Sequence, residues 1–188
     1  MKMSKLLPLL AVSGALAACS SVSTLNPVSY SGGYSASEAQ NAALSGTVNV
    51  EVLVQDETTQ QATEQAVTAA LNKHGPKWIV TRFESSSKSH SRYKLRYIID
   101  APVNLNPIQI CSLEEEELDF SKASSNGDVV IGAALCRDTH ALSYLRGRLL
   151  PADKPGTEAF TRVIGETGRT LMRNINPNRD DCSYIDCD

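Results

Sequence analysis

After its first twenty residues, the sequence has no apolar run long enough to cross a bilayer as a helix, which takes about 20 residues. It also has no excess of basic residues, since 18 Lys and Arg stand against 21 Asp and Glu, a formal net charge of −3. Nucleic-acid binding depends on clustered Lys and Arg that displace counterions from phosphates. We therefore expect neither a later transmembrane helix nor a nucleic-acid partner.

Catalytic signatures are scarce as well. The sequence holds no Gly-x-Ser-x-Gly motif and no His-Glu-x-x-His motif. Its three histidines are scattered: His74 falls where a predicted helix ends, His90 in a serine-rich stretch, and His140 in a predicted turn with Asp138. A structural or solvated role is the simplest interpretation of each. No catalytic residue and no cofactor is predicted.

The first nineteen residues carry the clearest signal in the chain. Lys2 and Lys5 precede an apolar segment too short to stay in a bilayer as a spanning helix, and this segment ends in Leu16-Ala17-Ala18-Cys19. The stretch resembles the lipobox signal peptide of bacterial lipoproteins. The resemblance implies that Cys19 becomes the mature N-terminus and carries the acyl chains, palmitate among them. By the same resemblance, Ser20 favours the outer membrane.

The alternative is an ordinary signal peptide cut after an Ala-x-Ala site, which would leave Cys19 unmodified. Several acyl chains on one cysteine are enough for stable anchoring, so the lipid is the membrane attachment we expect. Removal of residues 1–18 with their two lysines leaves 170 of the 188 residues and takes the net charge from −3 to −5. That length suits one compact domain with a tail.

Four further cysteines form an even set: Cys111, Cys136, Cys182 and Cys187. The bacterial periplasm is oxidising, so two disulfides are expected. Four cysteines allow three pairings. We favour Cys182–Cys187, because only four residues separate them in a polar terminal segment, and this leaves Cys111–Cys136. Zinc is the rival interpretation, but the sequence has no Cys-x-x-Cys pair and no histidine at ligand spacing, so no metal site is predicted.

The densest acidic cluster is Glu114–Glu117 with Asp119. Calcium binding needs converging oxygen ligands and usually a sharp glycine turn, and this run has neither the spacing nor the glycine. Consecutive glutamates are typical of a solvated face. The acids around Cys182 and Cys187 are a better calcium candidate, because a disulfide could fold them together, but a solvated tail is the favoured interpretation there too.

Composition divides the chain into three parts. Residues 1–18 are the predicted lipoprotein signal peptide, 19–46 a lipidated flexible tether, and 47–188 a single periplasmic α+β domain. Residues 20–46 are dominated by Ser, Gly, Ala and Asn without a sustained apolar period. Such a segment buries too little apolar surface to offset its ordering entropy. We therefore expect it to hold the domain clear of the membrane surface.

The first half of the predicted domain contains a strand, a helix and two more strands. Residues 47–55 alternate valines with other residues, which is typical of a strand with one buried face. A cap at 56–59 and a stop at Gly75 bound the helix. Residues 78–83 and 92–100 read as strands, and the short polar connection between them predicts an antiparallel hairpin.

The second half predicts two strands and a helix. Residues 128–136 are almost continuously apolar, which suits a strand buried on both faces, and the alternation over 141–149 favours a strand over a short helix. Residues 108–120 are ambiguous between a helical turn and an edge strand. Apolar side chains at three-to-four spacing predict a helix over 160–175.

Two glycines inside this last helix, Gly165 and Gly168, indicate a close backbone contact with the sheet. Together the elements predict an α+β fold, an antiparallel sheet of about five strands with two main helices packed on one face.

The most interesting cations lie on or beside the predicted strand 141–149. Arg146 and Arg148 share a face with Tyr144 if that strand forms, and Arg137 lies just before it. Arg and Tyr are enriched where interfaces concentrate binding energy, so these four residues form a possible binding patch. The alternative is a charged face that keeps the domain soluble.

The architecture resembles that of small accessory lipoproteins of envelope machines. We expect a non-catalytic binding or assembly domain, facing the periplasm and attached to the outer membrane, with an envelope protein as partner. A hydrolase of envelope material with an unrecognised site and a purely structural lipoprotein are the alternatives.

Overall fold

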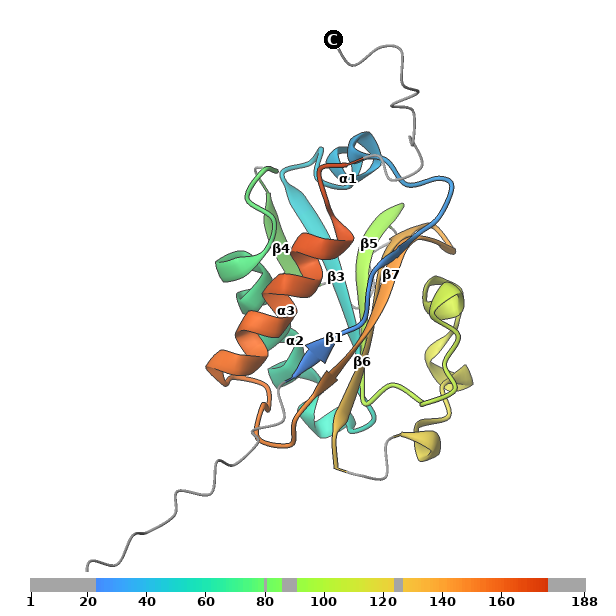
Figure 1. The fold of residues 1–188 in the computed structure, drawn as a ribbon, viewed down its shortest axis with the longest axis vertical. Helices are drawn as coiled ribbons and strands as arrows, with labels where there is room; N and C mark the ends of the chain where they lie inside the picture. Colours follow the sequence, from blue (N-terminus) through green and yellow to red (C-terminus); the bar gives the residue numbers. More distant parts are fainter. Residues whose placement is uncertain (1–22, 80, 86–90, 124–126, 176–188) are drawn as a thin grey trace, which may run out of the picture.

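The computed structural model describes residues 23–79, 81–85, 91–123 and 127–175. They form a seven-stranded sheet in the order β1-β7-β6-β5-β3-β4, with β2 also paired to β7 (Figure 1). The strands are β1 (Thr24–Leu25), β2 (Ser29–Tyr30), β3 (Thr47–Leu53), β4 (Arg82–Ser85), β5 (Tyr93–Ile99), β6 (Val129–Arg137) and β7 (His140–Leu149). In these ranges, no helix combines the length and the apolar character that crossing a membrane requires.

The sheet is mixed, whereas a purely antiparallel one was predicted, because β3 has two parallel neighbours. β4 pairs with β3 over Thr47–Val50, and β5 pairs with it over Asn49–Leu53. The predicted hairpin is therefore wrong, since its two strands lie on opposite sides of β3. Seven residues separate Ser85 from Tyr93. A segment of that length can span two strand spacings, about 10 Å, so it does not force the strands to pair.

The two main helices cover one face of the sheet, as predicted. They are α2 (Glu57–His74) and α3 (Glu158–Leu171). The Asp56 carboxylate accepts the amide hydrogen of Thr58 at 2.9 Å and so caps α2, while the Thr157 hydroxyl accepts that of Phe160 at 3.2 Å and caps α3. Their buried side chains pack with the valines of β3 and the apolar residues of β5, β6 and β7 in the larger of two cores.

The two helical glycines bring α3 close to α2 and not to the sheet. A Cβ atom on Gly165 would lie 2.3 Å from Cβ of His74, and one on Gly168 would lie 2.5 Å from Cδ2 of Leu71. Such separations are far inside van der Waals contact. The prediction of a close approach is thus right about the glycines and wrong about the partner.

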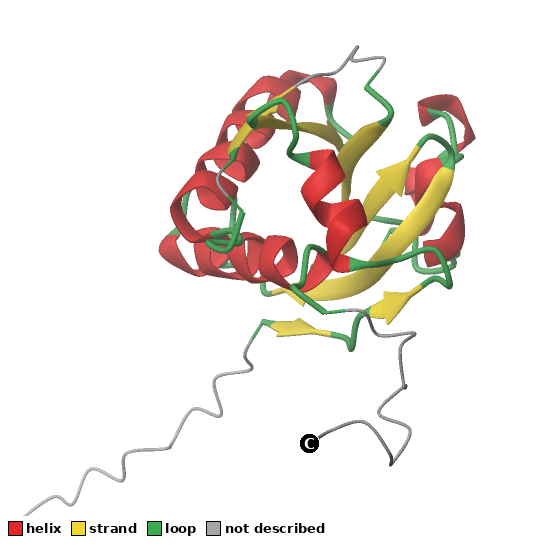
Figure 2. Ribbon diagram, turned by 90° about the horizontal axis from the view of Figure 1, so that it is seen from above, coloured by secondary structure: helices red, strands yellow, loops and turns green. Residues whose placement is uncertain are grey.

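A layer of short turns covers the opposite face of the sheet (Figure 2). This turn layer, residues 101–123, contains the 3₁₀ helices η1 (Pro107–Cys111), η2 (Glu115–Glu117) and η3 (Phe120–Lys122). It encloses a second, smaller core, in which Ile110 packs among buried residues of β5 and β6. The layer settles the ambiguity over 108–120 and explains why β6 is buried on both sides.

Residues 23–46 belong to the folded domain, so the predicted flexible tether is wrong over this range. They contain β1, β2 and α1 (Ala36–Ala42). Two tyrosines fasten them to the end of α3: the Tyr30 hydroxyl donates to the Thr170 carbonyl at 2.9 Å, and that of Tyr34, 3% exposed, donates to the Arg173 carbonyl at 2.6 Å. These anchors offset the low apolar content of the segment. Residues 19–22 lie outside the described ranges.

Candidate functional site

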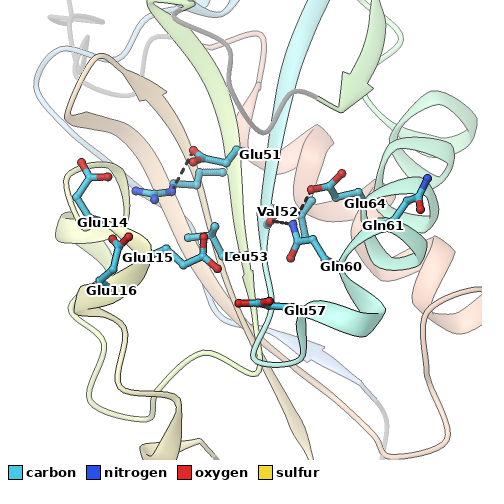
Figure 3. Close-up of a pocket in the computed structure, with 11 residues that line it drawn as sticks. Glu51, Val52, Leu53, Glu57, Gln60, Gln61, Glu64, Glu114, Glu115 and Glu116 are labelled. Carbon is cyan, nitrogen blue, oxygen red and sulfur yellow. Dashed lines mark hydrogen bonds and ion pairs between the residues drawn. The ribbon is translucent and has the colours of Figure 1, made fainter.

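A groove of about 480 Å³ opens beside the second half of β3 (Figure 3). Because β4 pairs only with Thr47–Val50, the rest of β3 has no strand neighbour on that side among the described residues. One wall is the first half of α2, and the other is the start of η2. The lining residues are Glu51, Val52, Leu53, Glu57, Gln60, Gln61, Glu64, Arg96, Glu114, Glu115 and Glu116.

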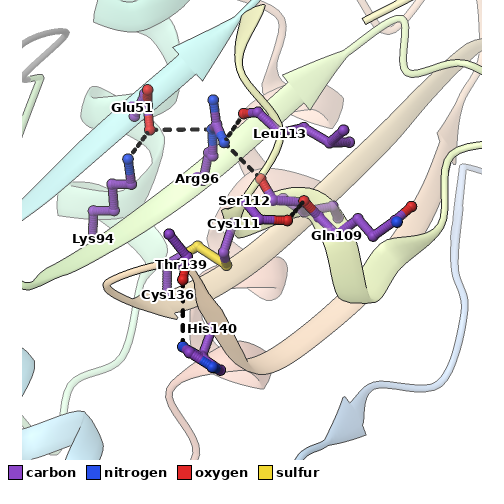
Figure 4. The surroundings of a disulfide bond; sticks show 11 residues. Glu51, Lys94, Arg96, Gln109, Cys111, Ser112, Leu113, Cys136, Thr139 and His140 are labelled. Carbon is purple, nitrogen blue, oxygen red and sulfur yellow. Dashed lines mark hydrogen bonds and ion pairs between the residues drawn. A yellow bond between two sulfur atoms is a disulfide. The ribbon is translucent and has the colours of Figure 1, made fainter. Parts of the chain in front are cut away.

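The floor of the groove is an ion-pair cluster of Glu51, Lys94 and Arg96 (Figure 4). The Glu51 carboxylate lies 2.7 Å from Nζ of Lys94 and 3.1 Å from Nε of Arg96, whose side chain is only 5% exposed. The guanidinium also donates to the carbonyl oxygens of Ile110 and Leu113, at 2.8 and 2.5 Å. A buried guanidinium needs such partners, and here they come from the turn layer. Arg96 therefore joins the groove floor to the turn layer.

The α2 wall is held in place by a glutamine. Nε2 of Gln60 donates to the Val52 carbonyl on the uncovered edge of β3 and to Oε1 of Glu64, the latter at 2.5 Å. The second oxygen of Glu64 accepts from the Ser85 hydroxyl at 2.7 Å. One backbone acceptor of the open edge is thus satisfied from the helix, and the Glu64 carboxylate is fixed between α2 and the end of β4.

Three groove carboxylates stay without a partner. Glu57 on one wall and Glu115 and Glu116 on the other make no side-chain hydrogen bond or ion pair within the described ranges. By contrast, Glu117 accepts the backbone hydrogen of Glu114 at 2.9 Å and closes the η2 turn. The groove therefore presents uncompensated negative charge from two facing walls, which favours a cationic partner.

The run Glu114–Glu117 was predicted to be a solvated face, and all four glutamates are exposed; three of them also form a wall of the groove. Residues 51–64 and 114–116 meet only because the turn layer folds back across the sheet. No spacing rule connects two such distant segments, so sequence reasoning missed the site. Among the described residues, no group of three or more His, Cys, Asp or Glu side chains is placed to hold a metal ion.

The disulfide Cys111–Cys136 is present, with the two Cα atoms 5.6 Å apart (Figure 4). It joins η1 to β6 and lies in the smaller core. This part of the cysteine prediction is confirmed. Cys182 and Cys187 lie outside the described ranges, so their pairing stays a prediction, as does the lipid on Cys19.

The predicted binding patch is split between the two faces of the sheet. Tyr144, Arg146 and Arg148 do share a face of β7. However, the Arg146 guanidinium donates to the carbonyls of Pro102 and Val103 at 3.0 and 2.9 Å, so it fastens the turn layer.

The other two arginines of the patch are also engaged. Arg148 pairs with Asp128. Arg137 lies on the helix-covered face, where it pairs with Glu38 of α1 at 2.9 Å. The row predicted from alternation exists, but its arginines already bind groups of the same chain. As a set the four residues form no single exposed surface.

Neither of the two described histidines, His74 and His140, lines the groove. His74 ends α2 beside Glu158, at 3.8 Å, in the structural position predicted for it. His140 is exposed at the β6–β7 turn, where Asp138 has φ +55° and pairs with Arg92 at 3.4 Å. His90 lies outside the described ranges.

Comparison with known proteins adds little. No family model matches the chain, and no curated protein does either. Among solved structures, two crystal forms of the PelC dodecamer from Paraburkholderia phytofirmans are similar, one of them a point variant. They are 10% identical, with TM-scores of 0.43 and 0.40, and the match covers 80% of this chain and 97% and 96% of those chains.

Proposed function

We propose that the chain is a lipoprotein held at the outer membrane by acyl chains on Cys19, and that its domain is a non-catalytic binding or assembly module facing the periplasm. The acidic groove carries the binding part of this proposal. It is concave, its walls come from two distant segments, and Glu57, Glu115 and Glu116 leave it with negative charge that no described residue neutralises.

Two features support the exported location. Leu16-Ala17-Ala18-Cys19 resembles the lipobox, and a buried disulfide joins Cys111 to Cys136. Structural disulfides persist in oxidising compartments such as the periplasm. Because residues 23–46 pack on the domain, few residues of the chain separate the acylated Cys19 from β1. In this arrangement the domain works close to the membrane surface.

The partner is an envelope protein with a basic segment. Complementary charge across an interface raises the association rate and excludes wrong partners. An extended segment suits the groove best, because on the side away from β5 the backbone of β3 at Glu51–Leu53 has no strand neighbour in the described chain, and the bond there comes from the side chain of Gln60. Addition of a strand to an exposed sheet edge is a recurring mode of peptide recognition.

The test is affinity capture from solubilised membranes after mild crosslinking, with two variants of equal charge change. The groove variant carries Glu57→Gln, Glu115→Gln and Glu116→Gln. The control variant carries Glu84→Gln, Asp138→Asn and Glu166→Gln, three exposed acids that pair with arginines elsewhere. We expect a stoichiometric envelope protein to be lost from the groove variant and kept by the control.

Retention of every partner by the groove variant contradicts the groove assignment. Absence of any stoichiometric partner from the wild type favours the purely structural lipoprotein. The anchor has its own test: Cys19→Ser should abolish processing by the lipoprotein route and membrane fractionation, and unchanged behaviour overturns it.

A further inference from the structure

A second cavity, of about 230 Å³, lies at the carboxyl ends of the parallel strands β3 and β5, at the lower end of the sheet in Figure 1. It is separate from the acidic groove and opens on the helix-covered face, near the first turns of α2 and α3. Its walls are largely apolar and include the buried side chains of Val54, Ile99, Leu149 and Phe160. In open sheets with parallel strands, the carboxyl ends are where ligands commonly bind.

One polar group that lines this cavity is the hydroxyl of a buried threonine. Thr63 of α2 is 4% exposed, yet its side chain makes no hydrogen bond to any residue in the described ranges. Another threonine of the same helix, Thr68, donates to the backbone carbonyl of Glu64 at 2.8 Å, which is the usual solution for a helical threonine. The Thr63 hydroxyl instead stays available to a group inside the cavity.

The second polar group is the Asp100 carboxylate. Asp100 directly follows β5 and has φ +59°, a left-handed conformation that is uncommon outside glycine. Its side chain makes no hydrogen bond or ion pair with the rest of the described chain, although it lines the cavity. Partial burial raises the pKa of this carboxyl, and no nearby cation counteracts the rise.

The neighbouring acids are already occupied. Asp56 accepts from the Thr58 amide and hydroxyl at 2.9 and 2.7 Å, and Asp153 accepts from the Ser23 hydroxyl at 2.5 Å. Lys154 is the one cation that lines the cavity, and it forms no ion pair within the described ranges. Asp100 is therefore the acid whose acceptor capacity remains unused there, and the cavity keeps an excess of negative charge.

We propose that this cavity binds an alkylammonium group, with the aliphatic chain between Ile99, Leu149 and Phe160 and the ammonium at Asp100 and Thr63. An ammonium supplies three hydrogen-bond donors, which the two carboxylate oxygens of Asp100 and the hydroxyl oxygen of Thr63 can accept. The volume is below the 300 Å³ or so at which drug-sized pockets begin, so it suits a small amine or a single lysine side chain.

The experiment measures binding to the purified full-length lipoprotein by NMR shift perturbation, at matched ionic strength. The probes are n-butylammonium and the neutral n-butanol. We expect saturable chemical-shift changes around Thr63, Asp100 and Phe160 with n-butylammonium. The Kd should be about 1–10 mM, because a probe with so few atoms can gain little binding free energy. Binding of n-butanol should be at least about tenfold weaker, because it cannot pair with the carboxylate.

The key variant is Asp100→Asn, since asparagine tolerates the left-handed conformation and keeps the side-chain shape. It should weaken n-butylammonium binding about tenfold, whereas Thr63→Val should weaken it a few-fold. Asp138→Asn is a matched control, because Asp138 has φ +55° but lies in the exposed β6–β7 turn. That control should bind like the wild type.

Equal binding of the amine and the alcohol overturns the proposal, as does wild-type affinity of Asp100→Asn or the absence of saturable shifts up to about 50 mM probe. A third probe, Nα-acetyl-lysine methylamide, separates two sources of the ammonium. Tighter binding than n-butylammonium supports a partner's lysine side chain, and weaker binding supports a free amine. Both results keep the ammonium assignment.

Discussion

The two faces of the sheet are covered by different means. On one face, two capped helices pack with continuous apolar surface and with each other through Gly165 and Gly168. On the other, the turn layer has fewer buried apolar residues and depends on specific fasteners: the Cys111–Cys136 disulfide, the Arg96 guanidinium and the Arg146 guanidinium. Regular helices distribute their stabilisation over many contacts, whereas an irregular layer concentrates it in a few.

This difference has a functional side. The acidic groove lies where the two coverings meet, with one wall from α2 and the other from η2. The α2 wall is fixed by a whole helix, and the η2 wall is fixed by Arg96 and the disulfide. Local openings of a protein begin where buried apolar contacts are few. We therefore expect the η2 wall to be the more easily displaced of the two.

The largest predicted effect is a matched pair of truncations, one on each face. Ile164 of α3 and Ile110 of η1 are both fully buried. Ile164→Ala should lower the free energy of unfolding by about 4 kcal/mol, and Ile110→Ala by about 2 kcal/mol, because the turn layer relaxes around the deleted atoms more readily. Urea denaturation followed by circular dichroism measures both values. Equal losses would show that the two coverings are equally rigid.

The disulfide should come next. Replacing Cys111 and Cys136 together by alanine should lower the free energy of unfolding by about 3 kcal/mol. The disulfide closes a loop with a sequence separation of 25 residues, which restricts the unfolded chain. Amide hydrogen exchange should then accelerate in residues 101–123 more than in α2 or α3. Uniform acceleration across both faces would contradict the assignment of the disulfide as a fastener of the turn layer.

Removal of the buried guanidinium should have a smaller effect. Arg96→Met leaves the carbonyls of Ile110 and Leu113 without their donor and should cost about 2 kcal/mol, because Lys94 still neutralises Glu51. Adding both Glu51→Leu and Lys94→Met to this variant should recover part of the loss, because the triple variant leaves no charge in the groove floor. The measurement is urea unfolding of the single and the triple variant. A triple variant less stable than Arg96→Met would refute the ion-pair account.

The contrast between the faces also explains how far sequence reasoning reached. The helix-covered face was predictable, because Asp56 caps α2 and the periodicity of α3 is regular. The strands β6 and β7 also matched their patterns of apolar residues. Each of these signals is local, so it survives without knowledge of tertiary contacts.

The turn layer and the strand pairing were not predictable for the opposite reason. A 3₁₀ helix is too short to give the sequence a repeating pattern of apolar residues. The side chains that hold the turn layer lie on distant strands, at Arg96, Cys136 and Arg146. Whether β4 and β5 pair with each other or with β3 is equally nonlocal, because the alternation of side chains is the same in both arrangements. Residues 23–46 were wrongly predicted to be a flexible tether for a similar reason, because the hydroxyls of Tyr30 and Tyr34 fix this segment to distant residues at the end of α3.

The smallest effect separates the two arginines that share a face of β7. Arg146 binds two carbonyls of the turn layer, whereas Arg148 pairs with Asp128 from an exposed position. Arg146→Met should therefore lower the free energy of unfolding by about 1 kcal/mol. Arg148→Met should lower it by a similar amount, about 1 kcal/mol, because it leaves the carboxylate of the buried Asp128 without its cation. The diagnostic measurement is amide exchange at Val103 and Leu105, which should quicken in the first variant and stay unchanged in the second. If Arg146→Met left both exchange and stability unchanged while abolishing capture of an envelope partner, Arg146 would belong to a binding surface and not to the fasteners of the turn layer.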